Sequence, residues 1–322
     1  MIYLPASRCG RCDWVISSQD RSQSRDVCGK FLLPHPMTGH RQIIPGLGAF
    51  ARMARLEPGI GRSTWTSPGR DNASVWTPGT DDAGLLAELA GFGPFFAVQT
   101  HWAGPAPPAP WQPLDTLLGS ATALTARIST VRDGLAAAAG CPAAEIEPRV
   151  AASVAQLGIA ARLISPVFGS AVLGVPLRID AGQARWLPAT GGPFPLSLAL
   201  SGDTARPGRP PAGLAEAAEA LTELLAGPVA ALVHMTAPMV SRRVLWGNVG
   251  SAINGAATMI STTRPPLRPA AIQLSAAALR LPELAGSYRG QPTTSFRRRS
   301  CCLIYRIAGN PQYCGDCILN AR

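Results

Sequence analysis

Apolar residues recur at helical spacing over most of the chain after residue 75. In the segment 145–173 they follow one another at three- and four-residue intervals, at Val150, Val154, Leu157, Ala161 and Ile164. This spacing places them on one face of a helix. Similar Ala- and Leu-rich patterns predict further helices over residues 82–91, 114–139, 214–225, 229–235, 241–260 and 272–279.

Short extended segments are expected between these helices. Residues 175–179 and 184–187 flank Asp180-Ala181-Gly182-Gln183, whose composition is typical of a turn, so we predict a β-hairpin there. A third strand is predicted at residues 192–200. The expected fold class is α+β, predominantly α-helical, with a small β-hairpin or sheet and a compact C-terminal lobe.

The beginning of the chain follows a different pattern. Residues 1–75 show no sustained apolar period and are rich in Arg, Ser, Gly and Pro. We expect this stretch to be disordered, or a non-native extension translated from an upstream start codon. The predicted organisation is therefore an N-terminal extension at 1–75, a helical domain at 76–290 and a C-terminal lobe at 291–322.

The net charge of the chain indicates which classes of binding partner to expect. The 322 residues carry a formal net charge of +10, and Lys30 is the one lysine among 29 basic residues. No Lys/Arg-rich run with interleaved aromatic residues is present, so we do not expect a nucleic-acid partner. The basic balance suits an anionic ligand, an acidic redox partner or an anionic membrane surface.

The sequence predicts a cytoplasmic protein. Residues 1–16 lack the basic region and apolar run of a secretory signal. Two apolar segments are interrupted, residues 150–175 by Arg162 and Pro166 and residues 244–263 by Asn248 and Asn254. Neither is a run of about 20 apolar residues, which a membrane-spanning helix needs. Peripheral contact with the inner face of the membrane is left open.

Four cysteines lie within 17 residues near the end of the chain, at Cys301, Cys302, Cys314 and Cys317. Clustered cysteines in a reducing cytosol indicate metal ligands, and four thiolates indicate a tetrahedral sulfur site or an iron–sulfur cluster. Zinc knuckles usually carry Cys-x-x-Cys on both sides. The adjacent pair suits a bulkier two-metal centre better. A zinc-stapled tail, a vicinal disulfide and a dithiol redox site remain as alternatives.

The cysteine segment resembles a known family. Residues 297–306, Arg-Arg-Arg-Ser-Cys-Cys-Leu-Ile-Tyr-Arg, and residues 313–319, Tyr-Cys-Gly-Asp-Cys-Ile-Leu, resemble the C-terminal signature of FhuF-like ferric-siderophore reductases. Two upstream helices are also similar to that family: residues 241–249, which contain Trp246-Gly247-Asn248, and residues 151–163. Two features depart from the family pattern: the gap between the cysteine pairs is eleven residues rather than ten, and its centre is Ala308-Gly309-Asn310-Pro311.

The resemblance implies a cofactor and a function. In that family four such cysteines hold a [2Fe–2S] cluster, so Cys301, Cys302, Cys314 and Cys317 are the expected ligands. The implied activity is one-electron reduction of siderophore-bound Fe³⁺ to Fe²⁺, with no catalytic residue beyond the cluster. Because no dinucleotide-binding fingerprint is present, a separate donor such as a ferredoxin or a flavin reductase is expected.

Several residues are candidates for substrate or donor contact. Basic residues flank the cysteines and would raise the cluster potential and attract anionic chelates or an acidic donor; they are Arg297, Arg298, Arg299 and Arg306. Trp246 and Asn248 are further candidates, although Trp246 also suits the core and Asn248 the satisfaction of a buried backbone group.

Other candidates are weaker, and other functions remain open. Cys9, Cys12, Cys28, His35 and His40 form a loose second metal motif. His234 suits a core or helix-cap role and Cys141 a structural one, whereas His101 suits packing and pocket lining equally. Two other functions would also account for the pattern: a non-redox binding protein with a zinc-stapled tail, and a general iron–sulfur electron carrier or sensor.

Overall fold

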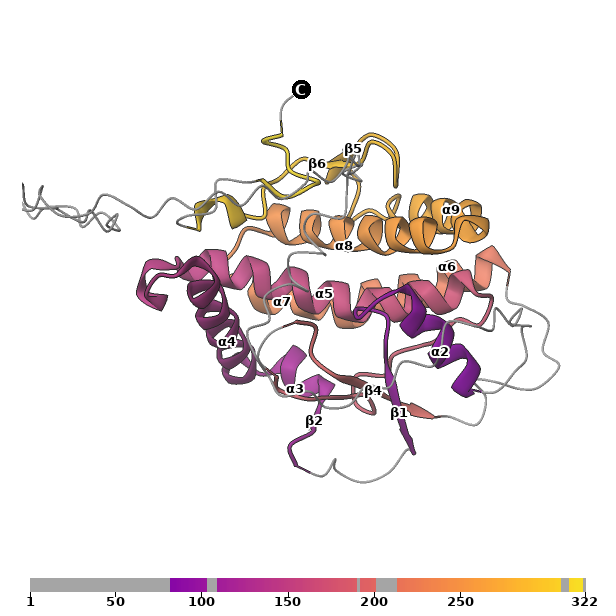
Figure 1. The fold of residues 1–322 in the computed structure, drawn as a ribbon, viewed down its shortest axis with the longest axis horizontal. Coiled ribbons are helices and arrows are strands. Elements are labelled where there is room, and N and C mark those ends of the chain that lie inside the picture. The colour runs from indigo at the N-terminus through magenta and orange to yellow at the C-terminus, as the bar shows by residue number, and fades with distance from the viewer. Residues whose placement is uncertain (1–81, 103–108, 190–191, 201–212, 308–312, 321–322) are drawn as a thin grey trace, which may run out of the picture. The chain divides into compact units, whose positions relative to one another are not determined.

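The computed structural model describes residues 82–102, 109–189, 192–200, 213–307 and 313–320 (Figure 1). The predictions for residues 1–75, including the second metal motif, lie outside these ranges. The described residues belong to one compact unit, Pro45–Arg322. Helices predominate, which confirms the predicted fold class; the α-helices are α2 Asp82–Phe92, α3 Leu114–Gly119, α4 Ala121–Ala139, α5 Pro148–Val172, α6 Leu214–Leu224, α7 Ala230–Thr236, α8 Arg242–Thr263 and α9 Arg268–Ala278.

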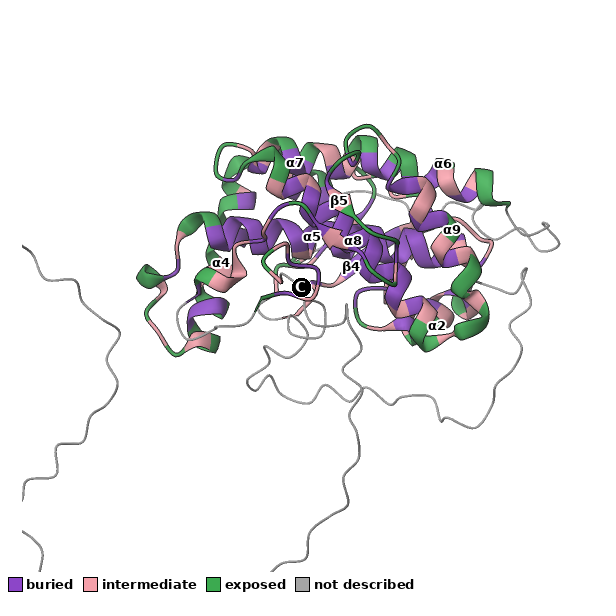
Figure 2. Ribbon diagram, turned by 90° about the horizontal axis from the view of Figure 1, so that it is seen from above, coloured by how far each residue is buried: buried purple, intermediate pink, exposed green. Residues whose placement is uncertain are grey.

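The centre of the fold is the pair α5 and α8, which lie side by side (Figures 1 and 2). Both helices are rich in Ala, Gly and Ser, and these small side chains let the two backbones approach closely. Almost every residue of α5 is buried, so its apolar positions extend around the helix rather than along one face. α4 and α6 pack against α5, and α9 packs against α8.

A buried arginine on α5 fixes the surrounding chain. Arg162 is 3% exposed and donates hydrogen bonds to the backbone carbonyls of Phe194, Phe95 and Ala97 at 2.7, 2.9 and 2.6 Å. Burial lowers the pKa of its guanidinium to about 10. This charge inside an apolar helix therefore serves to satisfy three carbonyl groups of two loops.

A small sheet lies across α5 from α8 (Figure 1). In the described residues its strand order is β1-β4-β3-β2, with β1 Gln99–Trp102, β4 Leu196–Leu200, β3 Arg185–Trp186 and β2 Gln112–Pro113. β1 runs parallel to β4, and the other pairs are antiparallel. His101 on β1 bonds the Ser197 hydroxyl at 2.8 Å and the Gln183 carbonyl at 3.1 Å, so it has a structural role.

Two predictions about these elements need correction. The single helix expected at 114–139 is broken into α3 and α4 because Ser120 is extended and its side chain accepts a hydrogen bond from Ala123 N at the start of α4. The expected hairpin has its turn, but residues 175–179 are not a strand. β3 pairs instead with β2 and β4. The third predicted strand is confirmed as β4.

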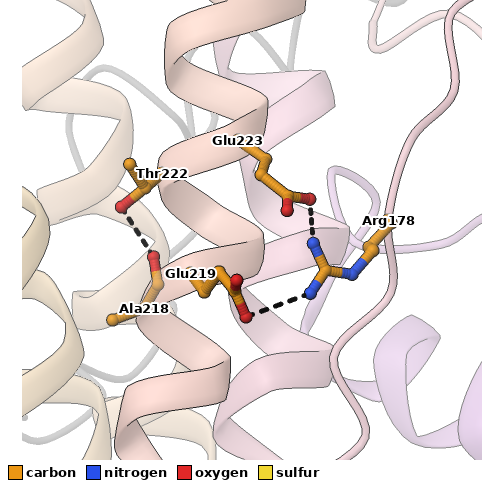
Figure 3. A network of polar contacts seen from close by, with 5 residues as sticks. All are labelled: Arg178, Ala218, Glu219, Thr222 and Glu223. Carbon is orange, nitrogen blue, oxygen red and sulfur yellow. Dashed lines mark hydrogen bonds and ion pairs between the residues drawn. The ribbon is translucent and has the colours of Figure 1, made fainter.

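The segment Leu214–Thr236 is one continuous helical stretch. α6 passes through a π-helical turn, Leu225–Val229, into α7. The turn contains Pro228, which lacks the N–H that an α-helical bond requires. On the exposed side, Arg178 pairs with Glu219 and Glu223 of α6 (Figure 3). These ion pairs connect the segment between α5 and β3 to α6.

Two helical segments of the described chain are long and apolar enough to cross a membrane. One is Pro148–Val172, of which 94% of the apolar window is buried inside the protein, and the other is Leu214–Thr236, with 39% buried. The first is the central core helix α5. Both segments meet this criterion by their length and composition alone.

The C-terminal lobe packs on α8. A two-stranded antiparallel sheet, β5 Tyr288–Arg289 and β6 Arg297–Arg298, leads into the cysteine segment. β6 contacts α8, and a short 3-10 helix at Ile304–Arg306 contacts α5. Both central helices therefore support the cysteines.

Candidate metal centre

The fold brings the four cysteine sulfurs together in one group, which includes two pairs in direct contact. The sulfur atoms of Cys302 and Cys314 are 3.5 Å apart, and those of Cys301 and Cys317 are 4.0 Å apart. Each pair contains one member of the adjacent dipeptide and one member of the Cys-x-x-Cys turn. The two halves of the sequence motif therefore interlock.

A turn at Leu303 allows the side chains of the adjacent residues Cys301 and Cys302 to lie on the same side of the backbone. In a regular strand, neighbouring side chains point to opposite faces. Here Leu303 adopts a left-handed conformation with φ of 70°, and its N–H donates to the Cys301 sulfur at 3.3 Å. Leu319 N–H donates likewise to the Cys317 sulfur at 3.4 Å. The backbone thus supplies hydrogen bonds to one cysteine of each half.

The site is open on one side. Cys302, Cys314 and Cys317 are buried at 1%, 5% and 1% exposure, while Cys301 is half-buried. Hydrogen bonds from Cys301 and Cys314 lower the pKa of the Cys317 thiol to about 3 and also lower that of Cys302. Each close pair therefore contains one cysteine that favours the thiolate form.

Arg298 lies behind the cysteines. It is completely buried, and its Nη2 donates to the Cys314 sulfur at 3.0 Å. Burial alone would lower the pKa of this guanidinium, but the Cys302 and Cys314 sulfurs and the Asp316 carboxyl raise it above its ordinary value. Arg298 is therefore a fixed positive charge against the sulfur atoms.

Asn248 of α8 connects this arginine to α5. Its Oδ1 accepts from Arg298 Nη1 at 2.6 Å, and its Nδ2 donates to the Ser153 carbonyl at 3.1 Å and to Gln156 Oε1 at 2.9 Å. The Ser153 hydroxyl donates in turn to the Cys302 carbonyl at 2.9 Å. One buried network thus reaches both halves of the cysteine motif.

A second contact holds the Cys-x-x-Cys turn on α8. The Ser251 hydroxyl donates to the buried Asp316 carboxylate at 2.6 Å. Burial raises the pKa of this carboxyl. The Asp316 carbonyl also accepts from Arg298 N–H at 3.0 Å, so the turn is fixed at both backbone and side chain.

Gly247 lets the lobe approach α8 closely. A Cβ atom at this position would lie 2.1 Å from the Ser300 hydroxyl oxygen. Only the absence of a side chain admits Ser300, which immediately precedes Cys301. The Trp246-Gly247-Asn248 segment therefore supports the cysteines through a small residue and a buried amide.

The sulfur spacing fits thiolate ligation of a tetrahedral metal. Two thiolates on one tetrahedral metal with bonds of about 2.3 Å would be about 3.8 Å apart, close to the distances within both pairs. Two buried donors of this segment, Arg298 Nε and Ser300 Oγ, have no protein partner and are free to donate to a cluster.

The other expected contact residues are dispersed. Arg299 and Arg306 are exposed, and Arg306 donates to Glu147 at 2.6 Å. Arg297 is half-buried and donates to the Gly315 carbonyl at 2.9 Å. The predicted contact of Arg298 with substrate or donor is wrong, because its side chain is completely buried.

Asn248 is a second correction. It is 0% exposed, so it cannot contact a substrate, and its Nδ2 satisfies a buried carbonyl instead. Trp246 is half-buried. His234 is exposed on α7, and Cys141 is half-buried near the end of α4. Four residues of the site were missed, namely Ser153, Gln156, Ser251 and Asp316. Ser153 and Gln156 lie in the family-like helix and Asp316 lies in the cysteine signature, but none gave a separate signal in sequence.

Comparison with known proteins gives one family match. Residues 298–317 match the family model described as the FhuF 2Fe-2S C-terminal domain. The match covers all four cysteines together with Arg298 and Ser300. A search of curated proteins found no match.

Proposed function

With a FhuF-type [2Fe–2S] domain at residues 298–317 as the premise, we propose that this protein reduces siderophore-bound Fe³⁺ to Fe²⁺. The four cysteines are the proposed ligands. One electron passes to the ferric ion for each iron released, and a separate donor, such as a ferredoxin or a flavin reductase, replaces it. We place this reaction in the cytoplasm, with peripheral membrane contact as an accompanying proposal.

The chemistry requires little of the protein beyond electron transfer. Siderophores hold Fe³⁺ through hard oxygen donors, and Fe²⁺ has a lower charge and a weaker affinity for them. The cluster, when bound, supplies a one-electron centre. The protein's own residues hold its sulfur ligands, shield three of them from water and leave the Cys301 side accessible.

This one-sided exposure is the observation that carries the proposal. An electron-transfer partner must come close to the centre, and the half-buried Cys301 offers such an approach. Exposed Arg299 and Arg306 flank it in sequence, and exposed Tyr313 precedes Cys314. Positive charge near the opening favours anionic chelates or an acidic donor.

The alternatives are separated by simple measurements. A zinc-stapled binding protein would be colourless, whereas a [2Fe–2S] protein absorbs visible light. The match to a 2Fe-2S family domain favours the second. A general electron carrier would reduce protein acceptors and ferric chelates without preference for siderophores.

The test is an anaerobic single-turnover assay. The purified holoprotein is reduced, freed of reductant and mixed with ferric hydroxamate or ferric catecholate, while Fe²⁺ is trapped by a chromogenic chelator. We expect one Fe²⁺ per reduced cluster with at least one siderophore class, faster than with ferric citrate. Equal rates for all chelates would support the carrier, and no reduction of any chelate would refute the proposal.

A further inference from the structure

Arg298 differs from the other buried arginines of the described chain because it donates a hydrogen bond to a cysteine sulfur. It is fully enclosed, yet it has no carboxylate within an ion-pair contact, and its two Nη groups bond an amide oxygen and a sulfur. A buried charge is costly unless it is compensated. The compensation here comes from the cysteine sulfurs and, at longer range, from the Asp316 carboxyl.

The orientation of Asn248 fixes the guanidinium. An arginine side chain has only donors, so the amide must present its oxygen to Arg298. The NH₂ group then faces the Ser153 carbonyl and Gln156 Oε1, which both accept. Every contact agrees with one orientation of this amide. The arginine is therefore aimed at Cys314 by a residue fifty positions earlier in the chain.

We propose that Arg298, oriented by Asn248, is a positioning residue that raises the reduction potential of the cluster through its hydrogen bond to the Cys314 sulfur. Reduction adds negative charge to the centre, and a cationic donor at 3.0 Å stabilises that charge. The unpartnered Nε of Arg298 can add a second hydrogen bond.

Burial distinguishes this effect from that of the surface arginines. Exposed charges such as Arg299 are screened by salt, whereas a buried pair is screened much less. The contribution of Arg298 to the potential should therefore be nearly independent of ionic strength. The proposal rests on the [2Fe–2S] domain and not on the siderophore, so it stands or falls separately from the proposed substrate.

The test is a potentiometric titration of the purified holoprotein followed by electron paramagnetic resonance, at 0.1 M and 1 M salt. Variants Arg298→Gln, Arg298→Lys and Asn248→Ser are compared with the controls Arg268→Gln and Arg299→Gln, which replace exposed arginines, at equal iron and sulfide content. Arg298→Gln should lower the equilibrium constant for reduction by about tenfold or more, which is about 59 mV for one electron.

Asn248→Ser keeps the charge but removes its orienting acceptor, so it should give a smaller shift of the same sign. Both shifts should persist in 1 M salt and be accompanied by a change in the resonance Raman band of the iron–cysteine bonds. Loaded Arg298 variants with unchanged potential would overturn the proposal. So would failure of both Arg298 variants to assemble a cluster while the two controls do, since Arg298 would then serve assembly alone.

Discussion

Three consecutive arginines of the cysteine lobe have three different surroundings. Arg297 is half-buried and bonds the Gly315 carbonyl, Arg298 is enclosed against Cys314, and Arg299 is exposed. Successive side chains of a strand point to opposite faces, and β6 places Arg298 on the face that meets α8. A basic run in sequence is therefore not a basic patch on the surface.

Arg299 is the arginine best placed to steer substrates. We expect Arg299→Gln to slow the reduction of anionic ferric chelates by a few-fold at 0.1 M salt, with little effect on cationic ones. The difference should shrink at 1 M salt, where the Debye length falls from about 10 Å to about 3 Å. Stopped-flow rates measure this, with Arg268→Gln, an exposed arginine on α9, as the matched control. Slowing that ignores chelate charge and salt would contradict steering.

The four cysteines should behave as two pairs. Serine at Cys301, Cys302, Cys314 or Cys317 should bleach or shift the visible [2Fe–2S] spectrum, although serine oxygen can retain a residual cluster. Because the close sulfur pairs are Cys301 with Cys317 and Cys302 with Cys314, the two variants within a pair should resemble each other. Visible and paramagnetic resonance spectra measure this.

The control for that series is Cys141→Ser, which lies outside the lobe and should match the wild type. A cysteine of the four whose replacement also leaves the spectrum unchanged would show that another residue supplies the fourth ligand.

At the scale of elements, α8 carries the lobe through a close approach. We expect Gly247→Ala to destabilise the protein by about 1–3 kcal/mol and to lower cluster content, because the new methyl group would overlap Ser300 Oγ. Thermal unfolding and iron analysis measure both effects. Adding Ser300→Ala should restore part of the loss. The control is Gly134→Ala on α4, where a Cβ meets nothing within 4 Å and helix propensity should favour alanine.

Long helices were predictable from sequence, and very short strands were not. α5 and α8 extend over 25 and 22 residues, so enough apolar residues recur at three- and four-residue intervals to identify each as a helix. β3 and β6 have two residues each, too few to establish any alternation. The failed hairpin has the same cause, since the two residues of β3 pair with β2, which lies far from it in sequence, and with β4, which follows it, rather than with residues 175–179.

The part of the candidate site that lies within one short segment of the chain was predictable from sequence. The cysteine motif indicates the cluster because all four members lie within one short segment. The role of Asn248 depends on partners 50 and 95 residues away, Arg298 and Ser153, and no local pattern reveals such contacts. The sequence accordingly pointed to Asn248 but not to the bond it makes with Arg298.

At the scale of the whole molecule, the described residues supply the core without the N-terminal segment. The buried apolar cluster extends from Leu85 to Ile307. We expect deletion of residues 1–64 to leave cluster content and melting temperature nearly unchanged, because that segment lacks an apolar period. Calorimetry and iron analysis of the truncated protein test this. A truncated protein without its cluster would instead assign a role to Cys9, Cys12 and Cys28.

The network around Asn248 also links cofactor occupancy to the cohesion of the fold. Its hydrogen bonds join α5, α8 and β6, and they enclose a cation whose compensation comes largely from the cluster ligands. A cofactor that binds only the native state stabilises that state. We therefore expect protein without its cluster to unfold at a lower temperature than the holoprotein, which calorimetry of the two forms would measure.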